Sequence, residues 1–336
     1  MKHLTQSLIG LATLAAVGLL GGCPRPATPP AQPPAEQEPQ PTETAGWPRT
    51  FTDAMDVETT LPKPPQRVVS LSTGFTEAIF AMGAGDRVAG RVTFAQYPAE
   101  VLDVPSVGGM IDPSLEAIVE LEPDLVLAVR GTPQDVVESV RRVGIPVIAR
   151  DPASLDDVLG CFRDLGSYLG VETDADALAD DLAVRAEAIT ERGDAIASGQ
   201  GRPSVLFVVG LDPVFVAGGG HFVHDMIERA GGLNAGTLVE GTEGEQWPSL
   251  SLETIVGLDP DIVVIAMMVN DELASAESPG GIASMPGWSD LSAVKAGRVY
   301  TIDPDIVLRA SPRLFDALEQ MADIVEDALS GEAGDG

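Results

Sequence analysis

Apolar residues along the chain fall into short runs separated by amphipathic stretches, which is the pattern of buried strands alternating with helices. The apolar runs predict strands at residues 67–71, 88–92, 125–129, 146–148, 204–209, 262–266 and 299–302. Helical spacing predicts helices at 77–82, ending at Gly83, and at about 222–230, ending at Gly231. This alternation predicts an α/β fold with parallel sheets.

One segment of this pattern occurs twice. Residues 114–126 and 251–263 are identical at nine of thirteen positions, at a constant offset of 137 residues. Each copy predicts a short amphipathic helix, a Pro-Asp turn and a buried strand. A single pair of copies indicates two related halves rather than a solenoid of many repeats.

A long amphipathic stretch at 173–198 separates the two halves. Its apolar residues recur at helical spacing near one face: Leu178, Leu182, Ala186, Ile189 and Ile196. We therefore predict two Rossmann-like α/β lobes, at 47–172 and 199–330, joined by one long interlobe helix. Ligands of open α/β sheets bind beyond the carboxyl ends of the strands, so two facing lobes predict a shared cleft.

The first residues have the features of an export signal. Lys2 precedes an uncharged apolar run at 8–20, and so short a run predicts a signal peptide at 1–22 rather than a membrane-spanning helix. The segment 23–46 contains eight prolines and almost no apolar bulk, which predicts an extended tether. The last residues, 331–336, are predicted to be disordered.

The end of the signal, Leu20-Gly21-Gly22-Cys23, resembles a bacterial lipobox. That resemblance implies cleavage before Cys23 and diacylation of its thiol, which would make the protein a lipoprotein anchored outside the cytoplasm. The alternative is an ordinary signal peptide followed by an incidental cysteine.

Charge and cysteine content narrow the possible partners. The chain has 51 acidic and 20 basic residues, a formal net charge of −31, so it is expected to repel nucleic acid and anionic lipid. Lysine occurs only at positions 2, 63 and 295, and this acidic, lysine-poor composition is compatible with a salty habitat. If Cys23 is acylated, Cys161 has no disulfide partner and is predicted to be a thiol of the core.

The order and spacing of several motifs resemble those of the class III periplasmic binding proteins, which serve importers of cobalamin, haem and iron–siderophores. The motifs are Pro65-Gln66-Arg67-Val68-Val69-Ser70-Leu71, Thr76-Glu77-Ala78-Ile79, Gly83-Ala84-Gly85-Asp86-Arg87-Val88-Ala89-Gly90, Val107-Gly108-Gly109 and the repeated segment. The resemblance covers about 50–328. It implies a monomeric, non-enzymatic binding protein that delivers its ligand to an ABC permease and its ATPase subunits.

Within that family the cobalamin binders are the most similar. The shared features are Arg130-Gly131 after a strand, Gly144-Ile145-Pro146-Val147, Trp247-Pro248, and Asp305 followed by Arg309-Ala310-Ser311-Pro312-Arg313. The resemblance implies that Trp247 packs on a corrin, while Asp305 and Arg309 hydrogen-bond its amides. The chain departs from the cobalamin binders where Met110, Val129 and Ile306 replace aromatic residues, so a ferric siderophore or haem remains an alternative ligand.

Ligand contacts are expected from loops that follow the strands. The candidates are Thr73, Gly74, Phe75, Phe94, Tyr97, Met110, Arg130, Phe215, Phe222, Trp247, Asp305 and Arg309. Flat aromatic rings stack on large conjugated ligands, and arginine donates several hydrogen bonds in a fixed fork. The structural alternatives are a tryptophan packed on its own loop and arginines that form surface ion pairs.

Glu77 and Asp225 occupy matching positions, each six residues before the glycine that ends a predicted helix. A carboxylate near a helix N-terminus is stabilised by the helix dipole, which is a sufficient structural reason for both. The family resemblance implies a second role, because an acidic residue at this place in each lobe docks on arginines of the permease. Glu228 is an alternative to Asp225.

Metal binding and catalysis are weakly indicated. His221 and His224 form an H-x-x-H pair, but these are the only histidines after the signal, and a zinc site usually needs more nitrogen or sulfur ligands. His221, His224 or Tyr97 would be the candidate iron ligand if the cargo were haem. No G-x-S-x-G or C-x-x-C motif is present, so a hydrolase is a remote alternative and no catalytic cofactor is expected. An adhesive lipoprotein is a third possibility, which the repeat argues against.

Overall fold

The computed structural model describes residues 46–242, 244–267 and 279–330. The predicted signal peptide, the predicted acylation site Cys23, nearly all of the predicted tether and the C-terminal tail lie outside the described residues. In the described part of the chain no helix combines the length and the hydrophobicity needed to cross a membrane.

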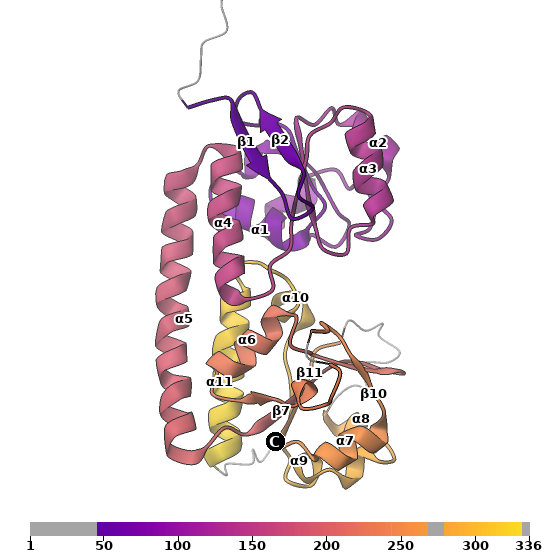
Figure 1. The fold of residues 1–336 in the computed structure, drawn as a ribbon, viewed down its shortest axis with the longest axis vertical. Coiled ribbons are helices and arrows are strands. Elements are labelled where there is room, and N and C mark those ends of the chain that lie inside the picture. The colour runs from indigo at the N-terminus through magenta and orange to yellow at the C-terminus, as the bar shows by residue number, and fades with distance from the viewer. Residues whose placement is uncertain (1–45, 243, 268–278, 331–336) are drawn as a thin grey trace, which may run out of the picture. The chain divides into compact units, whose positions relative to one another are not determined.

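The N-terminal lobe contains a parallel sheet with the strand order β4-β3-β5-β6 in the described residues. Its elements are β1 (Arg49–Thr52), β2 (Glu58–Leu61), β3 (Val68–Ser70), α1 (Thr73–Ala81), β4 (Val88–Arg91), α2 (Leu115–Glu120), β5 (Leu125–Val129), α3 (Gln134–Arg142), β6 (Val147–Arg150) and α4 (Leu155–Leu169). β1 and β2 form a separate antiparallel pair. Figure 1 shows this lobe in indigo to magenta.

The C-terminal lobe contains a second sheet with the order β10-β8-β7-β11-β12, and β9 also pairs with β7. Its elements are β7 (Ser204–Leu211), β8 (Val214–Val216), α6 (Phe222–Arg229), β9 (Leu233–Asn234), β10 (Ser249–Leu250), α7 (Leu252–Leu258), β11 (Ile262–Ile265), α8 (Pro279–Ala283), α9 (Ser292–Lys295), β12 (Val299–Thr301), α10 (Pro304–Val307) and α11 (Leu314–Ser330). The prediction of a purely parallel sheet is wrong for this lobe, because β8 returns through a tight turn and pairs antiparallel with β7.

The duplication extends to the register of the strands. Val68 pairs with Leu125 in one lobe, and Val205 pairs with Ile262 in the other, each 137 residues further along the chain. The Pro-Asp turn has the same function in both copies, because its aspartate accepts a hydrogen bond from the backbone at the start of the neighbouring strand. Asp124 accepts from Arg67 N at 2.9 Å and Asp261 accepts from Ser204 N at 2.8 Å.

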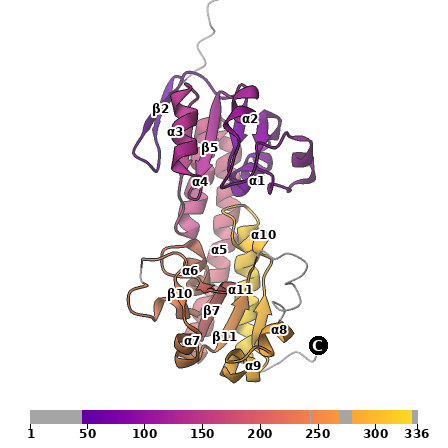
Figure 2. The same ribbon diagram turned by 90° about the vertical axis from the view of Figure 1, so that its right-hand side faces the viewer.

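The long helix α5 (Glu172–Gln200) packs against α4 of the N-terminal lobe and α11 of the C-terminal lobe. Figures 1 and 2 show α4, α5 and α11 on the same side of both sheets. The largest apolar cluster contains Phe75 and Phe162 from the first lobe together with Phe207 and Phe315 from the second. The two lobes therefore share one continuous core along these helices, and the predicted class III architecture is confirmed.

Helix α1 begins earlier than predicted. The Ser72 side chain accepts a hydrogen bond from Phe75 N at 3.3 Å and caps the helix, so Thr73 and Gly74 form its first turn instead of a loop. This start places Glu77 in the middle of the helix and turns Phe75 into the core, where it is fully buried.

Candidate functional site

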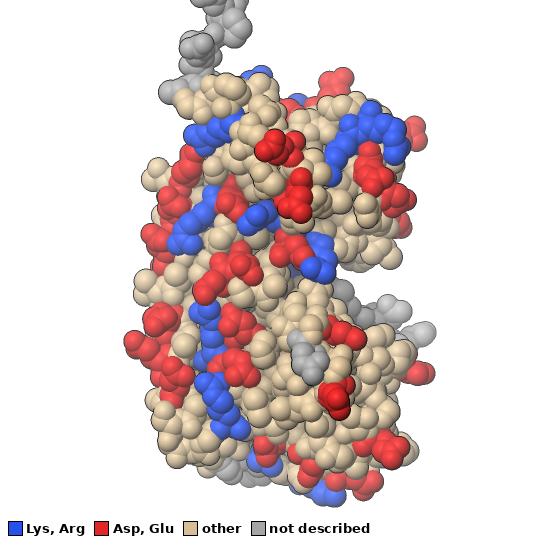
Figure 3. All heavy atoms as spheres, in the orientation of Figure 1, with Lys and Arg blue, Asp and Glu red and all other residues tan. Residues whose placement is uncertain are grey.

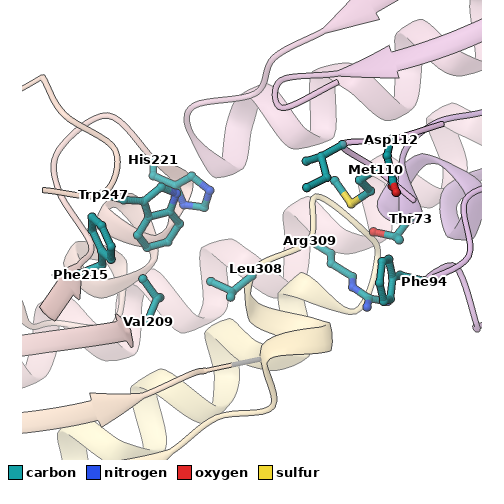
Figure 4. A pocket seen from close by; sticks show the side chains of 11 residues that line it. Thr73, Phe94, Met110, Asp112, Val209, Phe215, His221, Trp247, Leu308 and Arg309 are labelled. Atoms are coloured by element: carbon teal, nitrogen blue, oxygen red, sulfur yellow. The ribbon is translucent and has the colours of Figure 1, made fainter. Parts of the chain in front are cut away.

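A cavity of about 660 Å³ lies between the two lobes (Figure 4). Residues of both lobes line it: Thr73, Phe94, Met110, Ile111, Asp112, Val209, Phe215, His221, Trp247, Leu308 and Arg309. Most of these side chains are apolar or aromatic, and a few polar groups are placed among them. A volume and lining of this kind are typical of sites for small molecules and cofactors.

Trp247 and Phe215 form the aromatic wall on the C-terminal side (Figure 4). The Trp247 loop is fixed by hydrogen bonds from Gly218 N to Gln246 O at 2.8 Å and from Gly220 N to Glu245 O at 3.1 Å. Any Cβ at position 218 would lie 2.2 Å from Glu245 O, so the close approach of the two loops requires glycine there. The ring is therefore held by backbone contacts and faces the cavity.

His221 packs behind this wall, with its ring centroid 4.4 Å from that of Trp247. It is the N-cap of α6, because its Nδ1 accepts a hydrogen bond from Val223 N at 3.3 Å. Burial lowers the pKa of His221 to about 3, and the positive charge of Arg130 adds to the shift. The ring is therefore neutral, and the cap contact favours the tautomer with its proton on Nε2. A metal ion could bind at Nε2 only if that proton moved to Nδ1, which would break the cap.

The N-terminal lobe supplies the facing wall. Thr73 comes from the first turn of α1, whereas Phe94, Met110 and Asp112 come from the loops after β4 (Figure 4). The Phe94 side chain is 53% exposed, so its ring is available to a ligand at the cavity mouth.

The loop after α10 forms the floor between the two walls. Leu308 and Arg309 reach the cavity from this loop (Figure 4). The Arg309 side chain is only 9% exposed and forms an ion pair with Asp305, four residues earlier. Any Cβ at Gly74 would lie 2.4 Å from Ala310 O, so α1 and this loop can approach each other only because residue 74 is glycine.

A smaller pocket of about 310 Å³ shares Thr73, His221, Trp247 and Arg309 with the cavity. Its lining adds three further predicted residues: Gly74, Arg130 and Phe222. Arg130 donates from Nε to Asp151 at 2.5 Å, and its side chain remains 60% exposed.

The comparisons with known proteins identify the family. A family model described as periplasmic binding protein matches residues 68–306. The uncharacterized ABC transporter substrate-binding lipoprotein YvrC of Bacillus subtilis is 32% identical over 322 residues, covering 94% of this chain and 96% of that protein. The chain belongs to the periplasmic binding protein family.

Two further proteins are similar to this periplasmic binding protein, one in sequence and one in sequence and structure. A cobalamin-binding protein of Halobacterium salinarum is 30% identical over 315 residues, covering 93% of this chain and 83% of the relative. The solved structure of the periplasmic heme-binding protein RhuT from Roseiflexus sp. RS-1 matches with a TM-score of 0.70 at 29% identity. That match covers 79% of this chain and 99% of RhuT.

Most of the residues expected to bind ligand lie together in this periplasmic binding protein. They line one or both cavities: Thr73, Gly74, Phe94, Met110, Arg130, Phe215, Phe222, Trp247 and Arg309. The sequence did not single out Ile111, Asp112, Val209 and Leu308 as contacts. Ile111 and Asp112 directly follow Met110, so their place next to a predicted contact could have indicated that they also line the cavity.

Three of the predicted contacts line neither cavity in this structure. Phe75 is fully buried in the shared core. Tyr97 lies in a separate pocket of about 460 Å³ and stacks on Arg313, whose guanidinium carbon is 4.2 Å from the ring centroid. Asp305 is absent from the lining of either cavity, and its carboxylate pairs with Arg309.

The docking role predicted for Glu77 stays a prediction, and the structure gives this carboxylate an internal partner. Its side chain is only 4% exposed, and both carboxylate oxygens accept hydrogen bonds from Arg313 at 2.9–3.0 Å. Asp225 is likewise engaged, since it accepts from Leu155 N at 2.9 Å and pairs with Arg229. Its side chain is 27% exposed, and its docking role stays a prediction.

In the described part of the chain no group of three or more His, Cys, Asp or Glu residues is placed to hold a metal ion. The two histidines of the H-x-x-H pair have separate surroundings. His221 caps α6, whereas His224 Nδ1 lies 3.4 Å from the Asn234 side-chain amide.

Proposed function

We propose that this protein is an extracytoplasmic lipoprotein that binds a corrinoid between its lobes and delivers it to an ABC importer. The observation that carries the proposal is the interlobe cavity of about 660 Å³, in which Trp247 and Phe215 face Phe94 and Met110. Flat aromatic walls around a mostly apolar space suit a large conjugated ring, and the few polar groups suit its amide substituents.

The surroundings of the candidate iron ligands favour a corrinoid over haem. His221 uses Nδ1 as a helix cap, so binding iron through Nε2 would require its proton to move to Nδ1 and the cap to break. Tyr97 stacks on Arg313 outside the cavity. Neither residue is therefore poised to ligate haem iron in the way that haem proteins use histidine or tyrosine. The cobalamin-binding relative from Halobacterium salinarum supports the same ligand class.

The test is a titration of the purified protein with cyanocobalamin, cobinamide, haemin and ferric siderophores. Absorption spectra and native mass spectrometry report binding and stoichiometry. We expect one corrinoid per chain. Tight binding of haemin together with no binding of either corrinoid would overturn the cargo assignment and leave the family assignment intact.

Anchoring by Cys23 is part of the proposal. The run Leu20-Gly21-Gly22-Cys23 and the proline-rich segment after it support an acylated, tethered N-terminus. More than one acyl chain gives stable membrane association without a spanning helix. Cys23→Ser is expected to release the protein from the membrane fraction, and unchanged fractionation would contradict acylation.

Delivery requires a surface that meets the permease. Asp225 and Glu228 are more exposed than Glu77, and each already pairs with an arginine, Arg229 and Arg202 respectively. We expect Asp225→Asn to lower transport with little change in cargo affinity, and Glu228→Gln is the matched comparison. Unimpaired transport by both variants would leave the internal contacts as their only role.

A further inference from the structure

The charged groups around the cavity do not balance. Arg309 is paired with Asp305, Arg130 is paired with Asp151, and His221 is neutral. Asp112 also lines the cavity, and among the described residues no cation forms an ion pair with it. The cavity wall therefore carries one unmatched negative charge.

The position of this carboxylate depends on Gly109. A Cβ built at Gly109 would lie 2.1 Å from Asp112 Oδ1, so the carboxylate occupies space that is open because residue 109 has no side chain. Figure 4 shows Asp112 beside Thr73 and Met110, on the wall opposite Trp247. The carboxylate is exposed, so a ligand in the cavity can reach it.

We infer that Asp112 is a specificity-determining residue, which selects for cargo with a cationic or amide-bearing edge and against cargo with carboxylates. An ionised carboxylate only accepts hydrogen bonds, and the amide N–H groups around a corrin donate them. A haem bound with its propionates toward this wall would bring negative charge beside Asp112, where like charges repel. This inference rests on the proposed corrinoid function and adds a reason for its selectivity.

The experiment compares the affinities of wild type and Asp112→Asn for the cationic aquocyano form of cobinamide, for cyanocobalamin and for haemin. Asparagine keeps the shape of the side chain and removes its charge. We expect the ratio of cobinamide to haemin affinity to fall about two- to fivefold, the scale of an exposed charge interaction. This difference should shrink between about 0.1 M and about 1 M salt, because salt screens exposed charges.

Two further variants make the test specific. Gly109→Ala keeps the charge and forces the Asp112 carboxylate to turn, so it should change selectivity in the same direction as Asp112→Asn. Asp103→Asn makes the same chemical change at an exposed position of the same lobe that does not line the cavity, and should leave the ratio unchanged.

The outcomes separate the two proposals. If the wild type binds neither corrinoid, the proposed function fails. If the wild type binds corrinoids and Asp112→Asn keeps the same affinity ratio, only the role of Asp112 is overturned. An equal shift in Asp103→Asn would attribute the effect to net charge and would also overturn that role.

Discussion

His221 combines a structural role with a place in the binding wall. Its Nδ1 caps α6, and its ring packs against Phe222 and Trp247 at centroid distances of 3.9 and 4.4 Å. The capping role requires a neutral ring, because a protonated Nδ1 cannot accept the Val223 N–H. The charge state of this residue therefore links the stability of α6 to the shape of the aromatic wall.

This link predicts a loss of stability in acid. The pKa of His221 is lowered to about 3 in the folded protein, mainly by burial, so the unfolded chain takes up the proton first as pH falls below about 6.5. The stabilisation is present above that pH and is lost progressively toward pH 3, by at most roughly 5 kcal/mol. His221→Asn retains a good N-cap and should flatten this part of a curve of unfolding free energy against pH. An equal flattening in His224→Asn would contradict the assignment to His221.

Trp247 is the residue on which cargo affinity should depend most. Its loop is held by backbone hydrogen bonds, so removal of the indole should empty part of the cavity without unfolding the lobe. Trp247→Ala is expected to weaken corrinoid binding by about 1–3 kcal/mol, the contribution of one large buried aromatic contact. Trp47→Ala is the matched control, because Trp47 is also partly buried but lies near Gly170 and lines neither cavity. Equal affinity of both variants, measured by fluorescence or calorimetric titration, would contradict this role.

Matching acids in α1 and α6 connect each lobe to the chain of the other. Glu77 accepts hydrogen bonds from Arg313 just before α11, and Asp225 accepts one from Leu155 N at the start of α4. The start of α4 in the N-terminal lobe and the start of α11 in the C-terminal lobe are therefore each bound by a carboxylate of the opposite lobe. The matching positions that suggested permease docking have a structural explanation in this pair of contacts.

The Glu77 contact should stabilise the two-lobed arrangement. Loss of one partner of a buried ion pair costs about 3–5 kcal/mol, and we expect the lower end for Glu77→Gln because the Arg313 side chain is 24% exposed. Urea unfolding measures this change. Glu100→Gln is the control, since Glu100 is an exposed carboxylate that lines the same 460 Å³ pocket. A variant as stable as wild type but defective in transport would favour the docking interpretation instead.

The elements show why sequence reasoning predicted the fold better than the site. Strands, capped helices and the Pro-Asp turn depend on residues close in sequence, as with Ser114, which caps α2 by accepting a hydrogen bond from Ala117 N, and the duplication supplied a second copy of each signal. The contact between Glu77 and Arg313 joins residues 236 positions apart, and no local pattern reports it. Phe75 was misplaced for a related reason. Once Ser72 caps α1, the helical rotation directs that ring into the core.

At the scale of the whole molecule, the chain carries a large net negative charge, and acidic side chains are spread over the face drawn in Figure 3. Arginines of α5 offset part of it by pairing with acids on α11. Arg185 contacts Asp316 at 2.6 Å, and Arg192, one heptad later, contacts Asp323. These arginines link the interlobe helix to the C-terminal lobe, but the chain still has 51 acidic against 20 basic residues.

The balance between these pairs and the general repulsion predicts how stability responds to salt. Exposed ion pairs contribute about 0–1 kcal/mol each and weaken as salt is added, whereas the repulsion of a chain with a net charge of −31 opposes folding until it is screened. The Debye length falls from about 10 Å at 0.1 M to about 3 Å at 1 M, so widely spaced surface charges lose most of their repulsion over that range.

We expect the repulsion to dominate and Tm to rise when KCl is increased from about 0.1 M to about 1 M. Sucrose at matched osmolality separates charge screening from exclusion of solute from the surface. Arg192→Gln should lower Tm most at low salt, because it removes contacts with Asp323 and Glu326 and increases the net negative charge. A wild-type Tm that falls as KCl is added would show instead that the ion pairs outweigh the repulsion.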